Sequence, residues 1–231
     1  YRGTDAIVAV SEGVAADVAR ITGLPPARLP VVRNPVWSPE IEHLAQAPVT
    51  HPWFEARGAP VILGVGRLTR QKDFPTLMRA FARVRAQRRC RLLILGEGRG
   101  RAELMGLAQK LDITADVSLP GFVPNPYAYL ARAQLFVLSS RWEGSPNVLT
   151  EALALGVPVV ATDCPSGPRE ILRDGYYGKL VPMNDDVALA RAIEETLNRP
   201  LPSAMLKEAA RPYTFAAATA GYLAVLGLTR D

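Results

Sequence analysis

The feature that most constrains the fold is a repeated alternation of short apolar runs with longer segments of helical periodicity. The runs are rich in Val, Ile and Leu. Such alternation is typical of βαβ units, in which parallel strands are buried on both faces. The predicted strands are 6–10, 29–33, 60–65, 91–96, 116–119, 134–138, 157–161 and 179–181. The predicted helices are 12–22, 74–86 with Asp73 as its cap, 100–111, 126–133, 147–156, 186–198, 203–211 and 214–227.

These elements divide the chain into four predicted parts and predict an α/β fold, with a Rossmann-like parallel sheet covered by helices on both faces. Residues 1–34 are a short βαβ unit, and residues 59–199 are a six-stranded domain. Between them, residues 35–58 contain four prolines and no clear periodicity, which is typical of a linker. Residues 200–231 carry the last two helices, as a tail with no strand after it.

The composition is that of an ordinary globular protein, since 48% of the 231 residues are hydrophobic. No uncharged apolar stretch reaches the roughly 18 residues of a membrane helix, and the first residues lack the apolar run of a secretory leader. We therefore expect a soluble, cytoplasmic chain. The formal net charge of +5 favours small anionic ligands or an acidic membrane surface. Nucleic acid is not expected, because the sequence has no basic stretch interleaved with aromatic residues.

Two cations lie on the loop that leaves the predicted strand 60–65. Glycines at 64 and 66, which permit close approach to the backbone, are followed by Arg67 and Lys72. Parallel sheets bind ligands at the carboxyl ends of their strands. The planar guanidinium of Arg67 and the compact ammonium of Lys72 both suit phosphate oxygens. Taken alone, this segment fits an ordinary loop with surface charges equally well.

A second loop of this kind follows the predicted strand 134–138 and carries two carboxylates. Glu143 lies in the loop, and Glu151 lies one turn into the next helix. A carboxylate accepts two hydroxyl hydrogen bonds at once, so the pair suits sugars. The helix is predicted to begin at Pro146 or Asn147, and the free amides of Asn147, Val148 and Leu149 would form an anion site. The residues expected to bind ligand here are Glu143, Gly144, Ser145, Pro146, Asn147, Val148, Leu149 and Glu151.

Other functions fit parts of the sequence. Glu143 and Glu151 could be the acid and base of a glycosidase; their spacing leaves this open, although the neighbouring phosphate-binding residues argue against it. The run from Gly96 to Arg101 superficially resembles a dinucleotide loop. Arg101 stands in place of its third glycine, so NAD is not expected, and its arginines are interpreted as solvated. Both histidines, His43 and His51, are expected to be solvated linker residues.

Four motifs in register resemble one known family. The segment that begins Glu143-x7-Glu151 and continues to Leu172 resembles the nucleotide-sugar site of retaining glycosyltransferases of family 4, which have the GT-B fold. The resemblance covers essentially the whole chain. The three further motifs that match this family are Gly66-Arg67-Leu68 with Lys72-Asp73, Pro120-Gly121-Phe122-Val123, and Asp174-Gly175-x-x-Gly178-Lys179.

The resemblance implies a role for each site residue. Arg67 and Lys72 would bind the donor diphosphate and stabilise the leaving nucleoside diphosphate in place of a metal, with Gly66 beside them. Glu143 would hold hydroxyls of the transferred sugar, and Glu151 those of the ribose. The base would contact backbone near Phe122 and Val123, and the amides of Asn147, Val148 and Leu149 would face the sugar and phosphates. Arg67, Lys72 and Glu143 are the predicted catalytic residues, and no cofactor or metal is expected.

The resemblance also implies that the chain is part of a larger enzyme. Residues 1–34 would be the last βαβ unit of an amino-terminal acceptor domain, residues 35–58 the hinge, and residues 200–231 helices that cross back to that domain. We expect the fragment to bind donor weakly, to transfer no sugar and to self-associate through its exposed apolar edge. Any contact with the inner membrane surface would be peripheral and made through the missing domain.

The implied reaction is transfer with retention from a nucleotide sugar, with a UDP-hexose or UDP-N-acetylhexosamine as the preferred donor. The acceptor would be a saccharide or a lipid-linked saccharide of bacterial surface polysaccharide synthesis. Two alternatives stay open. One is another GT-B-type nucleotide-sugar enzyme, such as an epimerase, and the other is a module that binds nucleotide sugars without catalysis.

Overall fold

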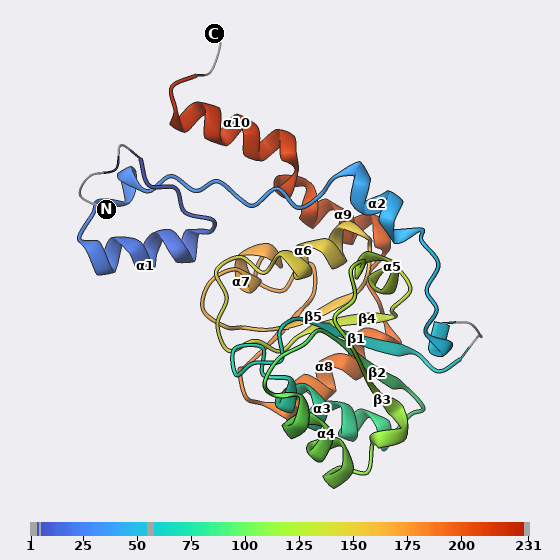
Figure 1. The fold of residues 1–231 in the computed structure, drawn as a ribbon. Coiled ribbons are helices and arrows are strands. Elements are labelled where there is room, and N and C mark those ends of the chain that lie inside the picture. Colours follow the sequence, from blue (N-terminus) through green and yellow to red (C-terminus); the bar gives the residue numbers. More distant parts are fainter. Residues whose placement is uncertain (1–3, 5, 55–57, 229–231) are drawn as a thin grey trace.

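A parallel sheet forms the centre of the structure, which is a computed structural model that describes residues 4, 6–54 and 58–228. In the described part of the chain six strands pair in the order β3-β2-β1-β4-β5-β6 (Figure 1). All five strand pairings are parallel, and the predicted fold class is confirmed. The strands are β1 (Val61–Val65), β2 (Arg91–Leu95), β3 (Val117–Gly121), β4 (Leu135–Leu138), β5 (Val159–Thr162) and β6 (Lys179–Val181).

Helices cover both faces of this sheet (Figure 1). One face packs against α3 (Phe74–Arg85), α4 (Arg101–Lys110) and α8 (Asp186–Asn198). The other packs against helices that include α6 and α9. The helices that contribute residues to the core of this second face are α2 (Pro39–Ala45), α5 (Tyr127–Leu130), α6 (Asn147–Ala154), α7 (Pro168–Ile171) and α9 (Ser203–Ala210).

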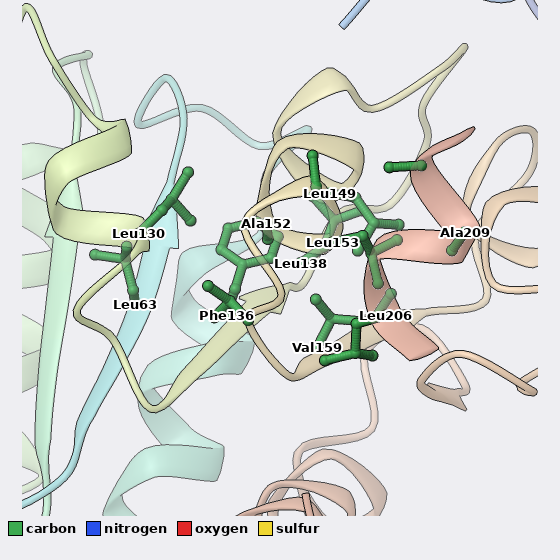
Figure 2. Packing of buried hydrophobic residues seen from close by; sticks show 14 of the residues in the cluster. Leu63, Leu130, Phe136, Leu138, Leu149, Ala152, Leu153, Val159, Leu206 and Ala209 are labelled. Atoms are coloured by element: carbon green, nitrogen blue, oxygen red, sulfur yellow. The ribbon is translucent and has the colours of Figure 1, made fainter. Parts of the chain in front are cut away.

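The strands alternate their side chains between two separate cores. Leu63 and Phe136 contact the cluster beneath α6 and α9, whereas their neighbours Ile62 and Val137 contact the cluster beneath α3 and α8. All four side chains are almost fully buried. Successive residues of a strand point to opposite faces, so a strand buried on both faces needs a continuous apolar run. Figure 2 shows the first core, where Phe136 lies between β1 and α6.

The helix α3 begins where the sequence predicted, but Asp73 does not cap it with its side chain. Asp73 occupies the N-cap position in the left-handed region, with a φ of 46°. Its carboxylate accepts a hydrogen bond from the Thr76 hydroxyl at 2.9 Å rather than from a backbone amide. The interpretation of Asp73 as a side-chain cap is therefore wrong, because its carboxylate binds the Thr76 hydroxyl instead.

The stretch predicted as a linker contains a helix that is held against the domain. The Asn125 side chain donates to the Leu44 carbonyl at 2.8 Å, and Arg132 donates to the Ala45 carbonyl at 3.0 Å, which joins α2 to the residues on either side of α5. His51 is half-buried, with Nε2 3.1 Å from the Ser118 hydroxyl, whereas His43 is exposed. The expectation of a solvated loop residue is therefore correct for His43 and wrong for His51. Residues 55–57 of this stretch lie outside the described residues.

The amino-terminal segment forms α1 (Glu12–Thr22) as predicted, but not the two strands on either side of it. Ala9 and Val31 make an isolated parallel bridge. Pro30 has no N–H to donate, and no third strand pairs with either partner in the described residues, so the ladder ends after one bridge. Residues 1–3 and 5, which the sequence placed in this unit, lie outside the described residues.

The two tail helices differ in their contacts. The first, α9, packs on α6, and its Leu206 is fully buried. The second, α10 (Phe215–Val225), points away from the sheet domain and buries only Ala218 among its residues (Figure 1). It exposes apolar side chains that include Phe215 and Leu223. No helix in the described part of the chain is long and apolar enough to cross a membrane.

Candidate functional site

The site lies where the strand order reverses, between β1 and β4. In the order 3-2-1-4-5-6 the connections of β1 and β4 run to opposite sides, so the loops at their carboxyl ends diverge and leave a crevice. The β1–α3 loop carries Arg67 and Lys72, and the β4–α6 loop carries Glu143. Two segments that are far apart in the sequence are therefore brought together by the topology alone.

Lys72 and Glu143 form a direct ion pair across this crevice. Lys72 Nζ is 2.6 Å from Glu143 Oε1, and the two side chains are only 15% and 8% exposed. The Ser140 hydroxyl donates to the same oxygen at 2.6 Å. Glu143 Oε2 receives no hydrogen bond from the described residues. The carboxylate is thus held through one oxygen and offers the other to a ligand hydroxyl.

Neighbouring hydroxyls hold the two loops around this pair. Ser139 donates to the Lys72 carbonyl at 2.7 Å, and Thr162 donates to the Ser140 carbonyl at 2.6 Å. Ser139, Ser140 and Thr162 are all buried. Because buried polar groups are costly when unpaired, these bonds fix the backbone from which Lys72 and Glu143 project. The sequence analysis did not identify Ser139 or Ser140; a pair of serines directly after a buried strand was the available signal.

Arg67 has opposite surroundings to Lys72. Its side chain is exposed and makes no ion pair with any described residue. It lines a cavity of about 510 Å³ that Gly66, Phe122 and Val123 also line. Arg67, one of the two predicted phosphate residues, is therefore brought to the same cavity as the predicted base residues. Lys72, Glu143 and the residues at the start of α6 lie outside its lining, on the β4 side of the crevice.

Tyr127 also lines this cavity, and the sequence analysis missed it. Burial raises its pKa, with smaller contributions from the charges of Glu151 and Glu40. The only sequence signal was an aromatic residue at the start of a predicted helix. Glu151 itself lies outside the lining of the cavity.

Glu151 is half-buried, and its carboxylate has no hydrogen-bond partner among the described residues. Desolvation raises the pKa of its carboxyl to about 7. A buried carboxylate without a donor is stabilised when a ligand supplies hydroxyl groups. Glu151 is therefore suited to bind a polar ligand, although its predicted contact with ribose is a hypothesis.

The start of α6 is less open than predicted. The Leu149 N–H donates to the Pro146 carbonyl at 3.0 Å, so this amide is not free to bind an anion. The helix starts at Asn147, with Pro146 as its N-cap residue. The first turn therefore offers fewer amides than the three that the sequence suggested.

Residues of the amino-terminal segment contact this same loop. The Ser11 hydroxyl donates to the Gly144 carbonyl at 2.7 Å, and the Asn34 amide donates to Asn147 Oδ1 at 2.8 Å. Nearby, Arg33 pairs with Glu170 at 2.7 Å. Two separate points thus connect the segment before residue 35 to the loop that carries Glu143. Sequence patterns gave no sign of these contacts.

The glycine-rich run after β2 packs against the β1–α3 loop rather than around a dinucleotide. A Cβ at Gly96, which has a φ of 138°, would lie 2.0 Å from the Gly66 carbonyl oxygen. The two loops also share backbone hydrogen bonds, for example from the Leu68 N–H to the Glu97 carbonyl at 2.9 Å. Arg101, interpreted as solvated, instead donates to the Leu119 carbonyl at 2.7 Å. That interpretation is wrong for Arg101, which anchors β3, but holds for the exposed Arg99.

Comparison with known proteins decides the family. Residues 51–213, more than half of the chain, match the family described as glycosyl transferases group 1. The chain belongs to this family. The match spans both loops of the crevice, and the GT-B architecture expected from the resemblance agrees with it. The finer assignment to family 4 and the retaining mechanism stay predictions.

Two relatives identified by sequence are named as bacterial glycosyltransferases. The chain is 32% identical, over 85% of its length and 52% of the relative, to N-acetylgalactosamine-N,N'-diacetylbacillosaminyl-diphospho-undecaprenol 4-alpha-N-acetylgalactosaminyltransferase of Campylobacter jejuni. It is 33% identical, over 84% of its length and 54% of the relative, to the lipopolysaccharide core biosynthesis glycosyltransferase LpsE of Rhizobium meliloti. The chain thus spans about half the length of these relatives.

Solved structures share the fold. Anabaena Alr3699/HepE in complex with UDP superposes with a TM-score of 0.83 at 20% identity, over 99% of this chain and 65% of that one. The lipopolysaccharide outer core galactosyltransferase WaaB gives a TM-score of 0.79 at 22% identity, over 97% and 62% of the two chains. At these identities the likeness shows the fold alone.

No group of three or more His, Cys, Asp or Glu side chains in the described part of the chain could hold a metal ion. The role expected for Arg67 and Lys72 in place of a metal ion stays a prediction.

Proposed function

We propose that this chain is the nucleotide-sugar-binding part of a retaining GT-B glycosyltransferase of family 4. The observation that carries the proposal is the Lys72–Glu143 ion pair at the switch point of the sheet, beside a cavity that Arg67 lines. A diphosphate requires cations and a sugar requires hydroxyl acceptors. The crevice brings both kinds of group together in a chain of this family.

The free oxygen of Glu143 supports its role toward the sugar. Lys72 and Ser140 both bind Oε1, which fixes the carboxylate and leaves Oε2 to accept a sugar hydroxyl. Lys72 has three N–H groups, so it can keep its bond to Glu143 while it donates to a phosphate oxygen. We propose that this shared lysine connects the recognition of the sugar to that of the diphosphate.

The residues that line the cavity suggest where the other parts of the donor would bind. Arg67 would bind the diphosphate, and the base would lie against the backbone of Phe122 and Val123. The Glu151 carboxylate would accept hydrogen bonds from the ribose hydroxyls. Tyr127, which lines the same cavity, would contact the nucleoside. Phe122 is 74% exposed, so a bound base would cover apolar surface that water contacts in the free chain.

We propose transfer with retention and without a metal ion. As the bond from the anomeric carbon to the phosphate oxygen breaks, its electron pair stays on the leaving nucleoside diphosphate. The acceptor hydroxyl attacks the same face, and its proton passes to a phosphate oxygen of the leaving group. Each cation contributes up to roughly 4 kcal/mol at an effective dielectric of about 20, before desolvation is subtracted. The stabilised species is the leaving diphosphate.

We propose a UDP-hexose or UDP-N-acetylhexosamine as donor and a saccharide or lipid-linked saccharide as acceptor. The named relatives support this choice, because one carries an undecaprenol-linked acceptor in its name and another acts in lipopolysaccharide core synthesis. Anabaena HepE, which shares the fold, was solved with UDP and glucose. The donor would reach the enzyme on the cytoplasmic side, with peripheral contact to the membrane made outside this chain.

Thermal unfolding with a panel of nucleotides tests the proposal. We expect UDP and UDP-sugars to raise the unfolding midpoint more than GDP or ADP do. A ligand at a hundredfold excess over Kd stabilises the fold by about 2.7 kcal/mol. Arg67→Ala should reduce the shift, whereas Arg191→Ala, which removes an exposed arginine of α8, should keep it.

The outcome separates the rival functions. No shift with any nucleotide would contradict the donor site. In the complete protein, UDP release together with a glycosylated acceptor supports the transferase. A changed sugar on an intact nucleotide would instead indicate an epimerase, and binding without turnover would indicate a binding module.

A further inference from the structure

A second cavity of about 780 Å³ opens on the other side of Arg67, between the β1–α3 and β2–α4 loops. Arginines from three different loops line it, and they are Arg67, Arg70, Arg99 and Arg141. We propose that this arginine cavity is a binding site for a phosphate-bearing ligand, separate from the donor site. The proposal goes beyond the proposed function, because neither the donor nor its reaction requires the cavity.

The charges of the cavity favour an anion. Arg70 and Arg99 are exposed and make no ion pair with any described residue, as is also true of Arg67. Arg141 is engaged with Asp73, at 3.2 Å between Nε and Oδ2. Guanidinium groups bind phosphate oxygens through paired N–H donors. Three arginines without ionic partners therefore remain for a ligand.

The acidic residues of the lining are mostly neutralised. Asp73 pairs with Arg141, and Glu97 pairs with Arg101 at 3.2 Å. Glu103 is the one lining carboxylate without an ion pair in the described part of the chain. The groups free to meet a ligand are therefore predominantly positive, which raises the local concentration of small anions.

The backbone adds to this positive potential. The helices α3 and α4 both begin at the cavity, since Phe74 and Gly100 line it. A helix start carries a partial positive charge, and two of them at one cavity add to the field of the arginines. These helix starts support the arginines rather than define the site, since the side chains supply the specific contacts.

The floor of the cavity is apolar. Leu68, Phe74 and Leu104 line it, and each is at most 3% exposed. Because these side chains are almost fully buried, they support the loops and offer a ligand little apolar surface. The volume of about 780 Å³ leaves room for a phosphorylated organic molecule, which is larger than a free simple ion.

Glycines give the cavity its shape. Gly98 has a φ of 157°, and a Cβ there would lie 2.6 Å from the Leu68 carbonyl oxygen. The Gly100 N–H donates to that same carbonyl at 3.0 Å. The two loops are therefore fixed against each other at backbone level, and the arginines project from a rigid base.

Among the described residues, only Arg67 and Glu97 line both this cavity and the donor cavity. The two sites are therefore separable by mutation, because Arg70 and Arg99 belong to the arginine cavity alone. A shared cation also couples them. A phosphate that engages Arg67 from one side weakens its contact with a diphosphate on the other, and the effect is reciprocal.

The experiment titrates pyrophosphate into the full chain by calorimetry, with and without saturating UDP, which fills the donor cavity. We expect a binding event that persists with UDP present. In the double variant Arg70→Ala/Arg99→Ala, we expect pyrophosphate affinity to fall at least about tenfold while the Kd for UDP changes less than twofold. The matched control, Arg191→Ala/Arg211→Ala, removes two exposed arginines elsewhere and should change neither.

A vesicle arm identifies the source of the phosphate. The chain is sedimented with phosphatidylglycerol vesicles and with phosphatidylcholine vesicles as the neutral reference. Binding to the anionic vesicles that the double variant loses and the control keeps would place a lipid headgroup in the cavity. Pyrophosphate binding without vesicle binding would indicate a soluble phosphorylated molecule.

The proposal is overturned if the double variant and its control bind both probes equally. If UDP fails to bind at all, the donor site is contradicted while the pyrophosphate titration still tests the arginine cavity. Circular dichroism melting of each variant verifies folding, and the four arginines replaced in the two variants are exposed and lack ion-pair partners in the described residues.

Discussion

Lys72 and Arg67 follow the same strand on the same loop, yet the fold surrounds their charges in opposite ways. Lys72 and its neighbours form a closed half of the crevice, in which Lys72, Ser140 and Glu143 bind one another and are largely buried. Arg67, Phe122 and Val123 form an open half, which lines a cavity and leaves the guanidinium exposed. Mutations in the two halves are therefore expected to have different effects.

This difference separates stability from binding. A charge that is paired inside the protein contributes to the fold before any ligand arrives, and removing it leaves its partner buried and unpaired. An exposed charge without a partner contributes almost nothing to the fold, so its value lies in what it binds. Mutations in the closed half should therefore affect both folding and function. Mutations in the open half should affect function but not folding.

The largest effect is expected for Lys72→Ala in the closed half. It leaves the Glu143 carboxylate, which is 8% exposed, without its cation. We expect a loss of about 3 kcal/mol in the free energy of unfolding, and a fall in turnover of the complete enzyme of about a hundredfold. Urea unfolding and steady-state kinetics measure the two effects.

The matched control is Lys179→Ala. Lys179 Nζ is 2.9 Å from Glu195 Oε2, but these side chains are 55% and 50% exposed. Removing a surface ion pair of this kind costs less than about 1 kcal/mol. Equal losses in the two variants would show that burial does not distinguish the closed half, and the comparison would fail.

The next effect is expected for Arg67→Ala in the open half. Turnover of the complete enzyme should fall at least about tenfold, because one cation no longer stabilises the leaving diphosphate. The midpoint of urea unfolding should stay unchanged, since Arg67 has no ion pair among the described residues. Unchanged turnover at saturating donor would remove Arg67 from the mechanism, and a clear loss of stability would contradict its place in the open half.

The smallest effect is expected for Glu151→Gln. Glu151 is partly buried, as in the closed half, but its carboxylate has no ion pair with a described residue, as in the open half. Burial raises the pKa of Glu151 to about 7 from an ordinary value of 4.5. Between these pH values the native state keeps a proton that the unfolded chain has lost, so stability falls as the pH rises through this window. The variant should be more stable than the parent at pH 8, by on the order of 1–2 kcal/mol, and nearly equal to it at pH 5.

The same variant should bind UDP more weakly at pH 8, because a neutral amide accepts fewer hydroxyl hydrogen bonds than a carboxylate. Chemical unfolding at both pH values and calorimetry with UDP provide the measurements. A variant that is stabilised equally at pH 5 and pH 8 would show that the charge of Glu151 is not the cause.

Much of the sheet domain could be predicted because its strands are buried on both faces. Such strands need continuous apolar runs, and the predicted β6 and α8 agree with the structure residue for residue. The errors fall where local patterns are weak. The prolines of residues 35–58 suggested a linker, but Asn125 and Arg132 hold the carbonyls of α2, and these partners lie about eighty residues away.

The site divides in the same way. Arg67, Lys72, Glu143 and Glu151 were visible in the sequence because polar residues after buried strands lie at the ligand-binding edge of a parallel sheet. Tyr127 and Ser140 were missed, because an aromatic residue at a helix start and a serine after a strand are common and do not by themselves indicate a ligand. The engaged amide of Leu149 likewise depends on how Pro146 ends the loop, which only the backbone geometry shows.

The sequence by itself thus determined the alternation of strands and helices, the loops that carry the charges and the chemistry of those charges, because these depend on local pattern and residue type. Only the tertiary structure decided that Lys72 forms an ion pair, while Arg67 has none with the part of the chain that the structure describes. That outcome depends on which loops the strand order brings together and how much water reaches them. The arginine cavity has the same origin, because its arginines come from three loops that are neighbours only in the folded chain.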